Sequence, residues 1–115
     1  MQLESRDLDT TRLITAGGDR LDAAAAIRFK DEMRNLTHDG PARIVLDMSA
    51  VSFMDSSGLG AVVGAMKQLN PDQVLELAGL TPTVMRVFSL TRMDTVFTIH
   101  PDVQTALGDD YAHAS

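Results

Sequence analysis

Three consecutive polar residues, Asp55, Ser56 and Ser57, separate an apolar run from a second, helical apolar run. Asp and Ser side-chain oxygens accept hydrogen bonds from the free backbone N–H groups that begin a helix. A serine hydroxyl in that position can also carry a phosphoryl group, because the unpaired N–H groups and the helix dipole favour negative charge. The segment therefore has two compatible interpretations, a simple helix cap and a phosphorylation site at Ser56.

Phosphorylation of Ser56 would change how this loop meets another protein. A phosphoserine adds roughly −1.5 to −2 charges at neutral pH. Such a change is large enough to repel an acidic partner surface. The phosphorylation reading thus predicts a regulated binding surface and does not require the chain to be a catalyst.

The elements on either side of this loop are an expected strand and an expected helix. Ile44–Leu46 is a short continuous apolar run, which favours a central strand of a parallel sheet that is covered on both faces. From Gly58 onward, apolar residues recur at intervals of three and four, as on one face of a helix. These residues are Leu59, Val62, Val63, Met66 and Leu69.

A second loop of the same kind lies earlier in the chain. Arg12–Ala16 favours a strand, Gly17 and Gly18 favour a turn, and Asp22 is placed to cap a helix that opens with four alanines. Both loops follow a strand and precede a helix, and such loops gather at one edge of a parallel sheet. We therefore expect the two loops to form one surface.

The rest of the chain continues the alternation of strands and helices. The expected elements are an edge strand near Gln2–Glu4, a strand over Val74–Ala78, a helix capped by the Thr81 hydroxyl with Pro82 at its first position, a strand over Thr95–Ile99 and a short helix opened by Pro101. This order predicts an α/β fold, a mixed sheet of four to five strands covered by about four helices. Residues 1–108 are expected to form a single domain, and 109–115 a disordered tail.

Composition excludes several classes of function. The net charge is −6, from 10 basic and 16 acidic residues, and no basic run is present, so nucleic acid is a poor partner. The sequence has no cysteine, so thiolate and disulfide chemistry are impossible. No apolar run reaches the roughly 20 residues of a membrane span, and the polar start is not typical of a secretory signal. We expect a cytoplasmic protein without membrane contact.

Candidate catalytic groups are few. The three histidines, His38, His100 and His113, are scattered, whereas a metal site or an acid–base pair needs converging partners. The segment Asp55–Gly58 is not the G-x-S-x-G turn of a serine hydrolase, and no phosphate-binding glycine loop is present. We therefore expect a binding module with no cofactor and no enzymatic activity.

Several segments together resemble a known family. VSFMDSSGLG (residues 51–60) is similar to the phosphorylation loop of the STAS domain family, in particular that of bacterial anti-sigma factor antagonists. GDRLDAAAA (residues 18–26) is similar to the family's G-x-L-D motif before its first helix, with one residue more than the commonest form. Residues 77–107 are similar to the family's closing half. The resemblance thus covers nearly the whole chain.

The resemblance implies roles for particular residues. The family's phosphoacceptor falls on Ser56, with Ser57 as the neighbour that starts the helix, and the acidic residue before the first helix falls on Asp22. The implied docking surface comprises Asp19, Asp22, Met54, Asp55, Ser57 and Gly58. Within it, Asp55 would hold the loop and its charge balance. Met54 has two open readings, an exposed partner contact that repacks on docking and an ordinary buried side chain.

The resemblance also implies a mechanism and its partners. The unphosphorylated chain would bind an anti-sigma factor that is an ATP-dependent serine kinase and so free a sigma factor. That kinase would phosphorylate Ser56 and break the complex, and a serine phosphatase would reset it. Two alternatives stay open: a non-switching subunit of a transport or lipid-trafficking assembly, and a small nucleotide-binding protein, which lacks any phosphate-binding pattern in its support.

Overall fold

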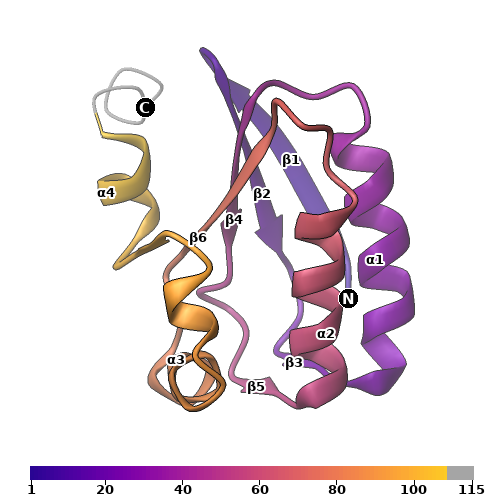
Figure 1. The fold of residues 1–115 in the computed structure, drawn as a ribbon, viewed down its shortest axis with the longest axis vertical. Coiled ribbons are helices and arrows are strands. Elements are labelled where there is room, and N and C mark those ends of the chain that lie inside the picture. Colours follow the sequence, from indigo (N-terminus) through magenta and orange to yellow (C-terminus); the bar gives the residue numbers. More distant parts are fainter. Residues whose placement is uncertain (109–115) are drawn as a thin grey trace.

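A five-stranded mixed sheet organises the fold of the computed structural model, which describes residues 1–108 (Figure 1). In spatial order its strands are β1 (Leu3–Leu8), β2 (Thr11–Ala16), β4 (Arg43–Asp47), β6 (Val74–Ala78) and β7 (Ile99–His100). The β1 strand runs antiparallel to β2, and all other pairs are parallel. The predicted α/β class and its mixed sheet are therefore confirmed.

The central position of β4 explains its sequence. Ile44, Val45 and Leu46 are all fully buried, as predicted for a strand that is covered on both faces. Ile44 and Leu46 belong to the main core. Val45 points to the opposite face and packs in a smaller core with Ala106 and Leu107. The sheet thus has a main core on one side and a minor core on the other.

Two long helices cover the main face of the sheet. The helices α1 (Ala23–Thr37) and α2 (Ser56–Lys67) lie side by side, and both begin at the same end of the molecule (Figure 1). Ala26, Phe29 and Met33 of α1 are buried against the sheet. The helix α3 (Pro82–Leu90) buries Val84 and Phe88 in the same core, and the short α4 (Val103–Leu107) covers the other face.

A second, two-stranded sheet joins the beginnings of α1 and α2. Its strands are β3 (Arg20–Leu21) and β5 (Phe53–Met54), which pair in parallel. Each strand is followed within two residues by a long helix. Arg20 and Leu21 of the GDRLD segment therefore belong to a regular strand pair, and the two loops are held together by backbone hydrogen bonds.

The predicted final strand over Thr95–Ile99 is wrong in most of its length. Met93–Thr95 forms the short 3-10 helix η1, and β7 contains only Ile99–His100. Arg92 adopts a left-handed backbone conformation after α3, and the Val96 and Phe97 amides both bond to the Met93 carbonyl. The turn places the Phe97 ring edge-on against Phe88, with centroids 5.9 Å apart, so burial of an aromatic side chain outweighs local strand preference.

The predicted capping role of the Thr81 hydroxyl is also wrong. Thr81 does occupy the N-cap position of α3, and Pro82 is the first helical residue. The hydroxyl instead donates to the Val51 carbonyl oxygen at 2.9 Å. Thr81 thereby ties the start of α3 to the segment that leads into β5.

Two further expectations concern the ends of the chain. The N-terminal edge strand covers Leu3–Leu8 and is longer than the predicted Gln2–Glu4 segment, because it pairs with β2 over the whole length of β2. The expected disordered tail, residues 109–115, lies outside the described residues. Among residues 1–108, no helix is both long and apolar enough to cross a membrane.

Candidate phosphorylation and docking site

The first turn of α2 presents Ser56 at the surface. Asp55 is the N-cap residue, and its Oδ1 accepts a hydrogen bond from the Gly58 amide at 2.9 Å. Ser56 and Ser57 are the first two helical residues, and both are exposed. The first amides of a helix have no partner within that helix, so this turn offers N–H groups and a positive dipole end beside the Ser56 hydroxyl.

The β3–β5 pair holds this turn against the second loop. The Asp19 carbonyl oxygen accepts hydrogen bonds from the Ser52 amide at 2.8 Å, the Phe53 amide at 3.1 Å and the Ser52 hydroxyl at 3.1 Å. Leu21 then pairs with Met54 in the strand register. The prediction that the two loops form one surface is confirmed, and the surface is tied together through the backbone.

Met54 points into the core and not toward a partner. Successive residues of a strand face opposite sides, so the paired Leu21 and Met54 share one side while Arg20 and Phe53 share the other. Leu21 is fully buried, and Met54 is 4% exposed and belongs to the main core. Of the two readings of Met54, the exposed partner contact is wrong and ordinary burial is correct.

Gly58 is required by close packing between the two loops. It is buried in the first turn of α2. A Cβ at this position would overlap the Leu21 carbonyl oxygen and would lie 2.9 Å from its carbonyl carbon. Glycine at residue 58 thus lets the start of α2 approach the β3 backbone.

Asp22 begins α1 in the same way that Asp55 begins α2. Its Oδ1 accepts a hydrogen bond from the Ala25 amide at 3.1 Å, and its Oδ2 lies 3.6 Å from Arg20 Nε. The bond from Ala25 first, and then Arg20, hold the pKa of the Asp22 carboxyl below its ordinary value. Asp22 is therefore ionised at neutral pH, and with the exposed Asp19 it makes this end of the molecule acidic.

Two residues of this surface were not singled out by sequence reasoning. The Arg20 guanidinium carbon lies over the Phe53 ring, 4.1 Å from its centroid. Phe53 is half-buried and Arg20 is exposed. In the sequence, Arg20 directly precedes the apolar Leu21, and Phe53 directly precedes the apolar Met54. Successive residues of a strand face opposite sides, so a strand pair here places Arg20 and Phe53 together on the side away from the core.

The described residues offer little for metal or acid–base chemistry. No group of three or more His, Asp or Glu side chains within residues 1–108 could hold a metal ion. His100 is bonded to Glu76 at 2.8 Å, far along the chain from Ser56, and His113 lies outside the described residues. Ser56 is thus an exposed hydroxyl at the first position of α2, next to the Asp55 cap.

Comparisons with known proteins show which family this chain resembles over most of its length. A family model described as the STAS domain matches residues 2–106. The anti-sigma-B factor antagonist of Listeria monocytogenes serovar 1/2a (strain EGD-e) is 32% identical over 100 residues, which are 86% of either chain. The anti-sigma-B factor antagonist of Staphylococcus aureus (strain NCTC 8325) is 30% identical over 92 residues, 79% of this chain and 84% of that one.

Solved structures share the fold. The crystal structure of an anti-sigma factor antagonist from Mycobacterium paratuberculosis superposes with a TM-score of 0.83 and 24% sequence identity. The alignment covers 96% of this chain and 93% of the other.

Proposed function

Because this chain belongs to the STAS domain family, we propose that it is an anti-sigma factor antagonist whose binding is switched by phosphorylation of Ser56. In the unphosphorylated state it binds an anti-sigma factor of the serine-kinase type in the cytoplasm, and the sigma factor is released. The curated relatives that match most of the chain carry the name anti-sigma-B factor antagonist, which supports this function over a non-switching subunit of a transport or lipid-trafficking assembly.

The observation that carries the proposal is the exposed Ser56 at the first position of α2. In the phosphorylation step, Ser56 Oγ attacks the γ-phosphorus of ATP held by the kinase. A bond forms between Oγ and phosphorus, the bond from phosphorus to ADP breaks, and the hydroxyl proton leaves to a base or to solvent. This chain supplies only the acceptor, so it acts as a substrate and a binding module and not as an enzyme.

The helix terminus explains how the phosphate can change binding without unfolding the chain. Negative charge is favoured beside the free amides of a first helical turn, so α2 tolerates phosphoserine at this position. The same group adds roughly −1.5 to −2 charges to the docking surface. A serine phosphatase hydrolyses the phosphoserine with water, which restores the hydroxyl and releases inorganic phosphate.

The other candidate residues take supporting roles in this proposal. Asp19 and Asp22 border the docking surface, and Ser57 and Gly58 lie on the turn that meets the partner. Asp55 holds the turn through its bond to the Gly58 amide. Met54 supports the loop from the core side, where it is buried.

The test is phosphorylation by the kinase that the chain captures from its own cell. The unphosphorylated chain is used as bait with and without ATP, and the captured kinase is purified and incubated with labelled ATP. We expect the kinase to label wild type and Ser57→Ala, the matched neighbouring serine, but not Ser56→Ala. Ser56→Ala should still bind the kinase. Labelling that persists in Ser56→Ala would overturn the assignment.

A further inference from the structure

Arg20 holds a fixed position on the outward side of the β3–β5 pair. Its guanidinium lies over the Phe53 ring at 4.1 Å, and its Nε lies 3.6 Å from Asp22 Oδ2. The Arg20 side chain is 57% exposed, and the Asp22 side chain is 30% exposed. The guanidinium therefore contacts the Phe53 ring and the Asp22 carboxylate, while much of the side chain faces solvent.

Several contacts reduce the freedom of this side chain before any partner arrives. The strand that carries Arg20 is fixed by the bonds from Ser52 and Phe53 to the Asp19 carbonyl. A guanidinium stacked on an aromatic ring is held by the cation–π attraction, and a paired carboxylate orients it further. A preorganised arginine loses less conformational entropy on binding than a free one.

The charges around Ser56 determine whether phosphorylation weakens or strengthens partner binding. Asp19, Asp22 and Asp55 make this surface acidic, and a basic partner surface would bind more tightly after phosphorylation. Release on phosphorylation therefore requires a negatively charged partner group near Ser56. Such a group needs a cation on this chain to offset the three aspartates, and Arg20 is the only basic residue in the sequence segments 17–27 and 48–66.

We infer that Arg20 is a specificity-determining residue that binds a carboxylate of the anti-sigma serine kinase. The inference rests on the proposed function and deepens it. The planar guanidinium donates two parallel N–H hydrogen bonds to a carboxylate, which a lysine cannot do. The partner carboxylate that Arg20 attracts in the unphosphorylated state is then the group that phosphate on Ser56 repels.

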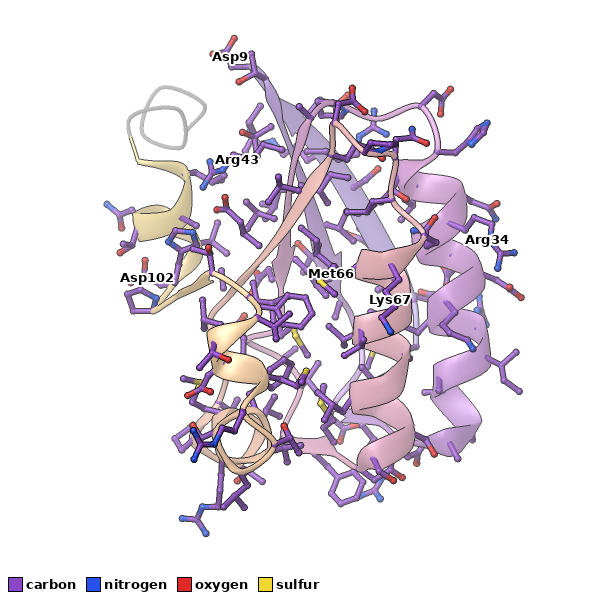
Figure 2. The ribbon with its side chains drawn as sticks, in the orientation of Figure 1. Asp9, Arg34, Arg43, Met66, Lys67 and Asp102 are labelled. Carbon is purple, nitrogen blue, oxygen red and sulfur yellow. The ribbon has the colours of Figure 1, made fainter. Side chains whose placement is uncertain are left out.

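The test measures the affinity of the purified kinase for a set of variants. Arg20→Gln removes the charge but keeps a long polar side chain, and Arg20→Lys keeps the charge but removes the planar fork. The matched control is Arg34→Gln, since Arg34 is an arginine of similar exposure, 65% against 57% for Arg20, and lies on α1 toward the end far from β3 (Figure 2). We expect Arg20→Gln to weaken binding roughly 10- to 100-fold, Arg20→Lys to fall in between and Arg34→Gln to bind as wild type.

Salt dependence and charge exchange provide two further readouts. Added salt should weaken wild-type binding more than Arg20→Gln binding, because one attractive pair is missing in the variant. Arg20→Glu should weaken binding of the kinase. Replacing the acidic residue of the kinase that faces Arg20 with lysine should restore the binding of Arg20→Glu. Wild-type affinity in Arg20→Gln would overturn the inference and leave the proposed function intact. A kinase that neither binds nor labels the wild-type chain would overturn both.

Discussion

The backbone carbonyl of Leu21 occupies the space that a Cβ atom on Gly58 would need. A Cβ there would also lie 3.0 Å from Leu21 Cγ, so neither backbone nor side chain leaves room. At Gly60, two residues further along α2, no atom beyond the neighbouring residues and the nearby backbone of α2 itself lies within 4 Å of the ideal Cβ position. The two glycines of one helix therefore have different physical roles, and substitution to alanine separates them.

We expect Gly58→Ala to lower the free energy of unfolding by about 1 to 3 kcal/mol, because the new methyl group forces β3 away from α2. Gly60→Ala should raise it by up to about 1 kcal/mol, because alanine stabilises an open helical position relative to glycine. Urea denaturation of both variants measures the difference. Equal stability of Gly58→Ala and wild type would show that the close approach is not as described.

The Asp55 cap leads to a second prediction. Asp55→Ala should cost about 0.5 to 2 kcal/mol, because the Gly58 amide loses its acceptor. Asp55→Asn keeps an oxygen in place and should retain most of the stability. If Asp55 acts by positioning the loop, the rate at which the kinase labels Ser56 should fall more in Asp55→Ala than in Asp55→Asn. Equal loss in both variants would instead assign the effect to the missing charge.

Local patterns predicted most of the fold. The buried β4 run and the capping aspartates Asp22 and Asp55 follow from residue types at short range. The predictions failed where a distant group decided the outcome. The Thr81 hydroxyl donates to Val51, thirty residues away in sequence, and no local pattern can show that acceptor.

The docking surface likewise contains some features that local sequence predicts and others that depend on distant contacts. The position of Ser56 at the start of a helix was predictable, because its neighbours are strong capping residues. The orientation of Met54 was not, since it depends on the pairing of two-residue strands that are more than thirty residues apart. Arg20 was overlooked for the same reason, because its contact with Phe53 arises only from that pairing.

Burial of Met54 gives a third prediction. Met54→Ala should destabilise the chain by about 2 to 5 kcal/mol, as for other large-to-small changes in a core. Met54→Leu, which nearly conserves volume, should cost less than about 1.5 kcal/mol and should leave kinase binding unchanged. Thermal denaturation and an affinity measurement on both variants check this. Loss of binding by a fully stable Met54→Leu chain would return Met54 to the partner surface.

A fourth prediction concerns charge at Ser56. Ser56→Asp should weaken kinase binding, but less than phosphorylation does, because one carboxylate carries less charge than a phosphate. Ser56→Asn is the matched control, with nearly the same shape and no charge. Calorimetric titration of the kinase with the three chains should rank their affinities as wild type, then Asn, then Asp. Equal affinity of the Asn and Asp variants would count against an electrostatic switch.

Glu76 of β6 is linked to α4 through Arg43, and this link is the basis of the fifth prediction. Its Oε1 accepts hydrogen bonds from Arg43 Nη2 at 2.9 Å and from His100 Nε2 at 2.8 Å. Arg43 lies beside α4 (Figure 2), and its Nη2 also donates to the Ala106 carbonyl of that helix. Burial raises the pKa of Glu76, but the bonds from Arg43 and His100 outweigh it and lower the pKa below its ordinary value of 4.5.

A lowered pKa means that ionised Glu76 stabilises the folded state above the unfolded pKa, and that this stability is lost as the pH falls through the folded pKa. Glu76→Gln should therefore cost about 1 to 3 kcal/mol at neutral pH, and the difference from wild type should shrink once the pH falls below about 4.5. Urea denaturation across this range measures it. Asp7→Asn is the control and should change stability by less than about 1 kcal/mol, because the Asp7 carboxylate that pairs with Arg12 is itself 60% exposed. If the loss of stability in Glu76→Gln relative to wild type grew as the pH fell, the proposed anchoring of α4 by an ionised Glu76 would be contradicted.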